Sequence, residues 1–155
     1  MKFKQHILIC GGTGCKASES DIILDAFTEK LSELKMNEEV QVVRTGCFGF
    51  CEQGPIVKIL PDNSFYVKVT PEDVDEIINE HLIKGRRVNR ILYVEPSGKN
   101  EIEKHKDMPF YKKQVRIALR NAGNINPEVI EEYIANNGYM AIGKALAEMT
   151  ADDVL

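Results

Sequence analysis

The sequence lacks any apolar run approaching the roughly 20 residues that a helix needs to cross a bilayer. It also lacks positive net charge: its 155 residues carry a formal net charge of −4, which argues against general nucleic-acid binding because that binding depends on a positive surface. The N-terminal MKFKQHILIC has no small-residue cleavage site, so it is not typical of a signal peptide. We therefore expect a cytoplasmic protein that neither inserts directly into a membrane nor binds nucleic acid.

Charge is unevenly distributed along the chain. Residues 1–80 contain 8 Lys and Arg against 14 Asp and Glu, whereas residues 81–155 contain 12 against 10. With 43% hydrophobic residues, the chain is long enough for one well-packed domain or for a small domain with an appendage. The acidic first half and the mildly basic second half predict two different modules.

The first 85 residues predict the element order β-α-β-β-β-α. Strands are expected at residues 5–10, 40–45, 56–60 and 64–69. A helix should follow the first strand with Ser18 or Ser20 as its N-cap, and Thr70-Pro71-Glu72-Asp73 is typical of the start of the second helix. Gly85 would end that second helix. This order is that of a thioredoxin-like α/β domain.

The remainder of the chain differs in character. Residues 86–108 contain one short apolar piece and then a charged run, which predicts a linker. Residues 109–155 predict a short all-helical segment, with helices over about 110–122, after 126–128 and over 139–149. Thr150 would cap a further helix, but only five residues follow it, so we expect the chain to be cut from a longer protein. Without a partner for their apolar faces, these helices are expected to hold no fixed position or to self-associate.

Four cysteines form two pairs, Cys10 with Cys15 and Cys47 with Cys51, at C-x4-C and C-x3-C spacing. Each pair follows a predicted strand directly. If the two strands are parallel neighbours, all four sulfurs can converge on one point at the same edge of the sheet. Four thiolates suit a structural zinc ion or an iron–sulfur cluster, and the spacing alone does not separate these two.

Glycines surround the cysteines and favour the cluster over zinc. More than half of the 11 glycines lie in the two cysteine loops: Gly11, Gly12, Gly14, Gly46, Gly49 and Gly54. Loops without Cβ atoms can wrap closely and point backbone N–H groups at sulfur, and such hydrogen bonds tune the reduction potential of a cluster. Zinc knuckles also use glycine turns, so zinc remains open.

Other interpretations explain the cysteine loops less well. Two disulfides would be unusual in a reducing compartment, and neither pair has the C-x-x-C spacing of a redox-active dithiol. Residues 12–17 fit the G-x-G-x-x-A pattern of a dinucleotide loop, but the second predicted strand ends in Arg44-Thr45 where that pattern needs an acid. The three histidines show no ligand spacing. The basic residues of 112–120 are interpreted as the solvated face of a helix.

The motifs C-G-G-T-G-C and T-G-C-F-G-F-C-E-Q-G-P closely resemble those of the thioredoxin-like [2Fe-2S] ferredoxin family, and the resemblance covers residues 3 to about 85. It implies a [2Fe-2S] cluster that takes and gives one electron. It further implies that Cys10 and Cys15 hold one iron and that Cys47 and Cys51 hold the other. The resemblance leaves the oligomeric state open, and a homodimer is one alternative because free-standing relatives of this domain tend to be dimers.

The C-terminal part resembles a second family. The stretch PFYKKQVRIALRNAG and the residues after it look like the opening of the NADH-binding flavoprotein subunit of respiratory complex I and of NAD(P)-linked iron hydrogenases. This implies three parts: a ferredoxin domain over 1–85, a linker over 86–108 and the first helices of a truncated FMN- and NADH-binding module over 109–155. The partners would be other redox subunits of a multi-subunit NAD(P)-linked oxidoreductase.

The same resemblance limits what the fragment can do. FMN, NAD and a [4Fe-4S] cluster are expected only in parts of the parent subunit that follow residue 155, so no catalysis is expected from these residues alone. The alternative from another functional class is a structural zinc-binding interaction module with no redox role.

Overall fold

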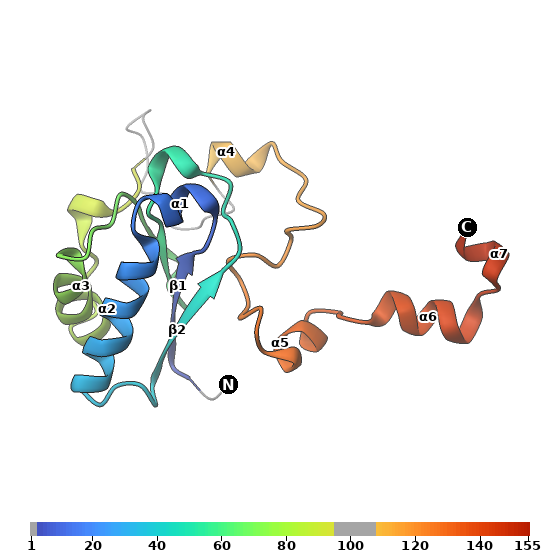
Figure 1. The fold of residues 1–155 in the computed structure, drawn as a ribbon, viewed down its shortest axis with the longest axis horizontal. Coiled ribbons are helices and arrows are strands. Elements are labelled where there is room, and N and C mark those ends of the chain that lie inside the picture. The colour runs from blue at the N-terminus through green and yellow to red at the C-terminus, as the bar shows by residue number, and fades with distance from the viewer. Residues whose placement is uncertain (1–2, 95–107) are drawn as a thin grey trace.

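A four-stranded mixed sheet forms the centre of the computed structural model, which describes residues 3–94 and 108–155 (Figure 1). The strands are β1 (Gln5–Cys10), β2 (Val40–Thr45), β3 (Val57–Leu60) and β4 (Ser64–Tyr66), in the order β2-β1-β3-β4. β1 runs parallel to β2 and antiparallel to β3, which pairs antiparallel with β4. Cys10 lies opposite Thr45, so the loops that follow β1 and β2 leave the sheet at the same edge, as predicted.

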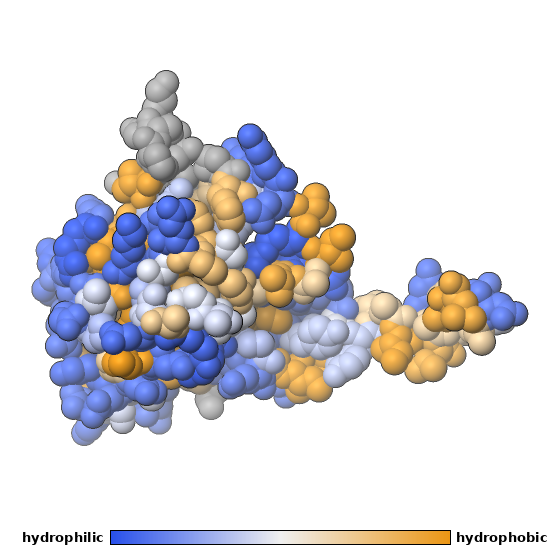
Figure 2. Space-filling view, turned by 45° about the horizontal axis from the view of Figure 1, so that its top comes forward, coloured by the Kyte–Doolittle hydropathy of each residue, from blue (hydrophilic) through white to orange (hydrophobic). Residues whose placement is uncertain are grey.

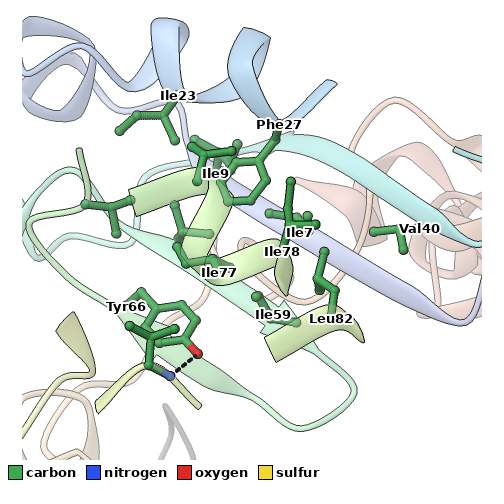
Figure 3. Close-up of a cluster of buried hydrophobic side chains, with 14 of the residues drawn as sticks. Ile7, Ile9, Ile23, Phe27, Val40, Ile59, Tyr66, Ile77, Ile78 and Leu82 are labelled. Carbon is green, nitrogen blue, oxygen red and sulfur yellow. Dashed lines mark hydrogen bonds between the residues drawn. The ribbon is translucent and has the colours of Figure 1, made fainter. Parts of the chain in front are cut away.

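Two helical segments cover one face of this sheet. They are α2 (Ser20–Glu33) and α3 (Asp73–Glu76), which continues into the π-helical turns of η2 (Ile77–Ile83). Figure 3 shows their apolar side chains packed against those of the strands. The fully buried members include Ile7, Ile9, Ile23, Phe27, Ile59, Tyr66, Ile77 and Ile78. Each such side chain contributes about 1.5–3 kcal/mol through burial, which makes this layer the main source of the domain's stability.

The start of the first helix differs from the prediction. A short helix, α1 (Thr13–Ala17), begins within the first cysteine loop, and Glu19 at φ 69° separates it from α2. Ser18 therefore ends α1 and Ser20 is the first residue of α2, so the prediction that either serine is an N-cap was wrong. The glycine-rich loop lets a helix begin directly after the strand, and a left-handed residue then redirects the chain.

The second helix ends as predicted but begins later. Its first residue is Asp73 and its N-cap is Glu72, whereas the sequence predicted Thr70 as the cap and Pro71 as the first helical residue. The carboxylate of Asp73 accepts hydrogen bonds from the backbone N–H of Thr70 at 2.8 Å and from its hydroxyl at 3.2 Å, which closes the turn before the helix. Gly85 adopts φ 69°, and its N–H donates to the carbonyl of His81, which closes the helix.

The predicted linker begins later than residue 86. Val88 and Ile91 are buried in the main core, and Leu92 forms an antiparallel bridge with Tyr66 of β4. The chain therefore stays on the domain until about residue 93. Most of the rest of the predicted linker, residues 95–107, lies outside the described residues.

Residues 108–126, hereafter the strap, pack on the second face of the sheet. They begin with α4 (Pro109–Lys112) and continue as turns. The prediction of a helix over 110–122 was therefore wrong. Backbone groups of Gly123 bond to side chains of the sheet instead, and such tertiary contacts override helix propensity. Met108, Tyr111, Gly123 and Asn126 are buried in this arrangement, whereas the expectation that the segment holds no fixed position or self-associates stays a prediction.

The last three helices extend away from the sheet (Figure 1). They are α5 (Ile130–Ala135), α6 (Met140–Glu148) and α7 (Ala151–Val154), so the predicted helix over 139–149 is confirmed. Thr150 caps α7 with a complete capping box, also as predicted. Figure 2 shows exposed apolar side chains on this extension, where Ile142 and Leu146 are 55% and 82% exposed. Among the described residues, no helix is long and apolar enough to span a membrane.

Candidate metal centre

The four cysteines lie together at the edge where β1 and β2 end. Cys10 is the last residue of β1 and Cys15 lies in α1. Cys47 follows β2, and Cys51 begins the short 3₁₀ turn η1 (Cys51–Gln53). The thiol of Cys15 interacts with that of Cys10, and the thiol of Cys51 with that of Cys47. The structure thus brings all four predicted residues together as two pairs.

The four sulfurs are arranged as two pairs, and their convergence on one point stays a prediction. Among the residues that the structure describes, no three His, Cys, Asp or Glu side chains are placed so that they could hold one ion. Each pair instead occupies its own loop.

Glycines keep the space between the two pairs open. A Cβ atom at Gly12 would lie 2.8 Å from the sulfur of Cys47 and 3.5 Å from that of Cys10. A Cβ atom at Gly54 would lie 2.8 Å from the sulfur of Cys15, and one at Gly14 would lie 3.4 Å from that of Cys51. All four sulfurs therefore face positions that only glycine leaves free. The glycines counted in the sequence form a cradle, which explains why these loops contain them.

The two pairs differ in exposure. Cys10 and Cys15 are each 1% exposed and belong to an apolar cluster that includes Phe48 and Ile56. Cys47 is half-buried, and Cys51 is exposed. The centre therefore has a buried side and a side that faces solvent.

The surroundings of Cys15 and Cys51 do not by themselves favour thiolates, because both pKa values are raised. Burial, together with the neighbouring Cys10, raises the pKa of the Cys15 thiol to about 12. The pKa of Cys51 is raised mainly by the charge of Cys47. Negative charge on these sulfurs thus calls for a positive group between them, and a bound metal deprotonates coordinating thiols outright.

A backbone donor is already in place on one sulfur. The N–H of Gly49 donates to the sulfur of Cys47 at 3.2 Å, and Gly49 adopts φ 77°, which glycine reaches without strain. Hydrogen bonds of this kind lower the energy of negative charge on sulfur. Four thiols, a glycine cradle and a backbone donor fit a thiolate-bound metal group.

The strap contributes contacts to this centre that the sequence analysis missed. Arg116 approaches the carbonyl of Cys47 at 3.4 Å, and Tyr111 donates to the carbonyl of Phe48 at 2.8 Å. The sequence had been interpreted as giving Arg116 a place on a solvated helix face. The glycine at position 123 was a sequence sign of a turn, and in the structure it adopts φ 77°.

Comparisons with known proteins agree with this geometry. The family model "Thioredoxin-like [2Fe-2S] ferredoxin" matches residues 2–82. A 2Fe-2S ferredoxin of Clostridium pasteurianum is 38% identical over 96 residues, which cover 57% of this chain and 94% of that protein. The crystal structure of the wild-type thioredoxin-like [2Fe-2S] ferredoxin from Aquifex aeolicus superimposes with a TM-score of 0.54 at 32% identity, covering 61% of this chain and all of that one.

One further relative belongs to a larger assembly. The NADP-reducing hydrogenase subunit HndC of Solidesulfovibrio fructosivorans is 51% identical over 43 residues, which cover 28% of this chain and 9% of that subunit. The thioredoxin-like fold predicted from the sequence is therefore confirmed, whereas the hydrogenase match concerns a short stretch alone.

Proposed function

The chain belongs to the thioredoxin-like [2Fe-2S] ferredoxin family and carries a [2Fe-2S] cluster, and we propose that Cys10, Cys15, Cys47 and Cys51 are its ligands. The observation that carries this proposal is that each of the four sulfurs faces one of three loop glycines, Gly12, Gly14 and Gly54, which leave room beside it. The first pair would hold one iron and the second pair the other, since each pair lies in one loop and its two thiols influence each other.

The function of such a centre is electron transfer. When bound, the cluster supplies a site that accepts and releases one electron. Residues of the chain control the cluster's access to water and the energy of negative charge on its ligands. The apolar cluster around Cys10 and Cys15 excludes water from one side, and the Gly49 N–H stabilises negative charge on the sulfur of Cys47. The exposed Cys51 marks the side from which a partner can approach most closely.

The finer proposal is that this electron transfer serves a multi-subunit NAD(P)-linked oxidoreductase. In this interpretation residues 1–85 form the ferredoxin domain, and residues 109–155 open a flavoprotein module whose FMN and nucleotide sites lie in other parts of the parent subunit. Its support is the short match to the HndC subunit and the C-terminal resemblance. The partners would be further redox subunits, and self-association into a homodimer would be the alternative arrangement.

Anaerobic affinity purification of the tagged chain from its native host tests this finer proposal. We expect NAD(P)H-dependent viologen reduction to co-purify with it, together with a flavoprotein. Size-exclusion chromatography with light scattering on the same sample separates a hetero-complex from a homodimer. Elution of the chain without NAD(P)H-oxidising activity would contradict the multi-subunit proposal but would leave the cluster itself untouched.

A further inference from the structure

The strap clamps the second cysteine loop at several successive points. Tyr111 donates from its hydroxyl to the carbonyl of Phe48 at 2.8 Å, and the N–H of Gly123 donates to the hydroxyl of Thr45 at 2.8 Å. The ring of Phe110 stacks on that of Phe50 with centroids 4.8 Å apart. These contacts join residues more than 55 positions apart in the sequence, so the loop's conformation depends on a distant segment.

A buried lysine anchors the strap from the sheet side. Lys58 of β3 is 1% exposed, and its ammonium donates to the carbonyl of Gly123 at 2.9 Å and to the side-chain oxygen of Asn124 at 3.2 Å. Burying an ammonium is costly unless it is hydrogen-bonded, and the strap supplies those acceptors. Lys58 therefore holds the strap at one place on the sheet.

The anchored strap brings a second cation to the cysteine loop. The guanidinium of Arg116 lies 5.8 Å from the centre of the Tyr111 ring, a distance at which a cation–π contact is favourable. From there one of its nitrogens approaches the backbone carbonyl of Cys47 at 3.4 Å. Its charge also contributes to lowering the pKa of Lys58.

We propose that Arg116, held by the strap, is a positioning residue that raises the reduction potential of the cluster. The inference rests on the proposed ligation by Cys47. A cluster with four thiolate ligands gains negative charge on reduction, and a nearby positive charge stabilises the reduced form more than the oxidised form. Residues well beyond the last proposed ligand are on this account part of the electron-transfer site.

The test is redox potentiometry of the anaerobically purified full chain, followed by its visible absorption. Three variants are compared with the wild type: Arg116→Gln removes the charge, Arg116→Lys keeps it, and Arg120→Gln removes an equal charge from an exposed position of the strap. We expect Arg116→Gln to lower the reduction equilibrium constant by up to about tenfold, which is about 59 mV for one electron. Arg116→Lys should recover most of this shift, and Arg120→Gln should change little.

Ionic strength provides a second readout. Because Arg116 is only half-buried, the difference between wild type and Arg116→Gln should shrink as salt is raised. A purely structural role would give a shift that does not shrink with salt and would not distinguish Lys from Gln. If Arg116→Gln loses its cluster, Arg116→Met, which keeps an apolar stem over Tyr111, carries the same comparison.

The outcomes separate this inference from the proposed function. Equal potentials of the wild type and Arg116→Gln, or equal shifts in Arg116→Gln and Arg120→Gln, would overturn the role of Arg116, while a reversible one-electron couple in the wild type would still support electron transfer. A wild-type protein without any such couple would overturn both.

Discussion

Each of the two cysteine loops holds two of the proposed ligands, but the surroundings of the two loops differ. The first, residues 10–15, lies between β1 and α1, and both of its cysteines are buried. The second, residues 46–51, leaves one cysteine half-buried and the other exposed, and the strap completes its surroundings. One half of the centre is therefore formed locally by a strand and a helix, whereas the other half depends on a segment more than 55 residues further along the chain.

This difference indicates which half of the centre decides whether a cluster binds and which half sets the properties of a bound cluster. The first loop is fixed by the sheet and the apolar cluster, so changes there should affect whether the cluster binds at all. The second loop is held by a few hydrogen bonds and ring contacts, so changes in the strap should affect the properties and lifetime of a cluster that still binds.

The largest expected effect is at the point where the two loops meet. In Gly12→Ala the new Cβ would lie 2.8 Å from the sulfur of Cys47, so that sulfur must move. We expect the variant to lose most of its iron, measured by metal analysis and visible absorption. Gly46→Ala is the matched control, because its Cβ would meet only Ala122, at an ordinary 3.4 Å, and it should keep its iron. Equal iron content in the two variants would show that the cradle is not needed.

A smaller effect is expected from releasing the strap. Gly123 adopts φ 77°, and a Cβ there would lie 2.2 Å from the ring of Phe48. Gly123→Ala should therefore cost about 2–4 kcal/mol of overpacking and backbone strain. We expect faster tryptic cleavage at Arg116 and Arg120 and a shorter cluster lifetime in air, with iron still bound after anaerobic purification.

The control for the strap lies in α6. A Cβ at Gly143 would meet nothing within 4 Å, so Gly143→Ala should leave cleavage of the strap unchanged and should raise helix stability by up to about 1 kcal/mol. If both glycine variants are cleaved at the wild-type rate, the strap does not hold the second loop.

The smallest expected effect is a dependence of stability on pH through Lys58. Burial, with a lesser contribution from the charge of Arg116, lowers the pKa of Lys58 to about 8 from its ordinary value of 10.5. Between these values the unfolded chain binds more protons than the folded one, so the free energy of unfolding rises with pH in that window. The stability gained through Lys58 from pH 8 to pH 9 should be about 1 kcal/mol.

Urea unfolding of wild type and Lys58→Met at these two pH values measures this contribution as a difference. The free energy of unfolding should rise from pH 8 to pH 9 by this amount more in the wild type than in Lys58→Met. Other groups that titrate in this range are the same in both proteins, so their contributions cancel in the difference. A difference between the two proteins that is constant with pH would mean that Lys58 is not buried against the strap.

The sequence predicted where both cysteine loops lie but not the contacts that the strap makes with the second loop. Strand periodicity and the cysteine positions were enough to place Cys10 and Cys15 at the edge of a sheet, because those features depend on neighbouring residues. The contacts of Lys58, Arg116 and Gly123 were not predictable in the same way, because they join β3 to a segment whose helical pattern suggested a solvated helix. Lys58 stands within an otherwise apolar strand, which suggests a buried polar contact. The sequence does not identify its acceptors, Gly123 and Asn124.

The helix ends also show that local features were predicted and that features imposed by more distant structure were not. Asp73 and Gly85 act through the backbone of adjacent turns, and their roles were predicted from local rules. Glu19 adopts a left-handed conformation that its residue type does not suggest, because the position of α1 in the cysteine loop imposes it.

The most direct test of the central claim is the visible absorption spectrum of anaerobically purified protein before and after dithionite, with iron and zinc assayed on the same sample. We expect a red-brown protein that bleaches on reduction and contains about two irons per chain and no zinc, with the iron lost in a Cys15→Ala variant. A colourless wild-type protein holding one zinc through these cysteines would contradict the assignment of a [2Fe-2S] cluster to them.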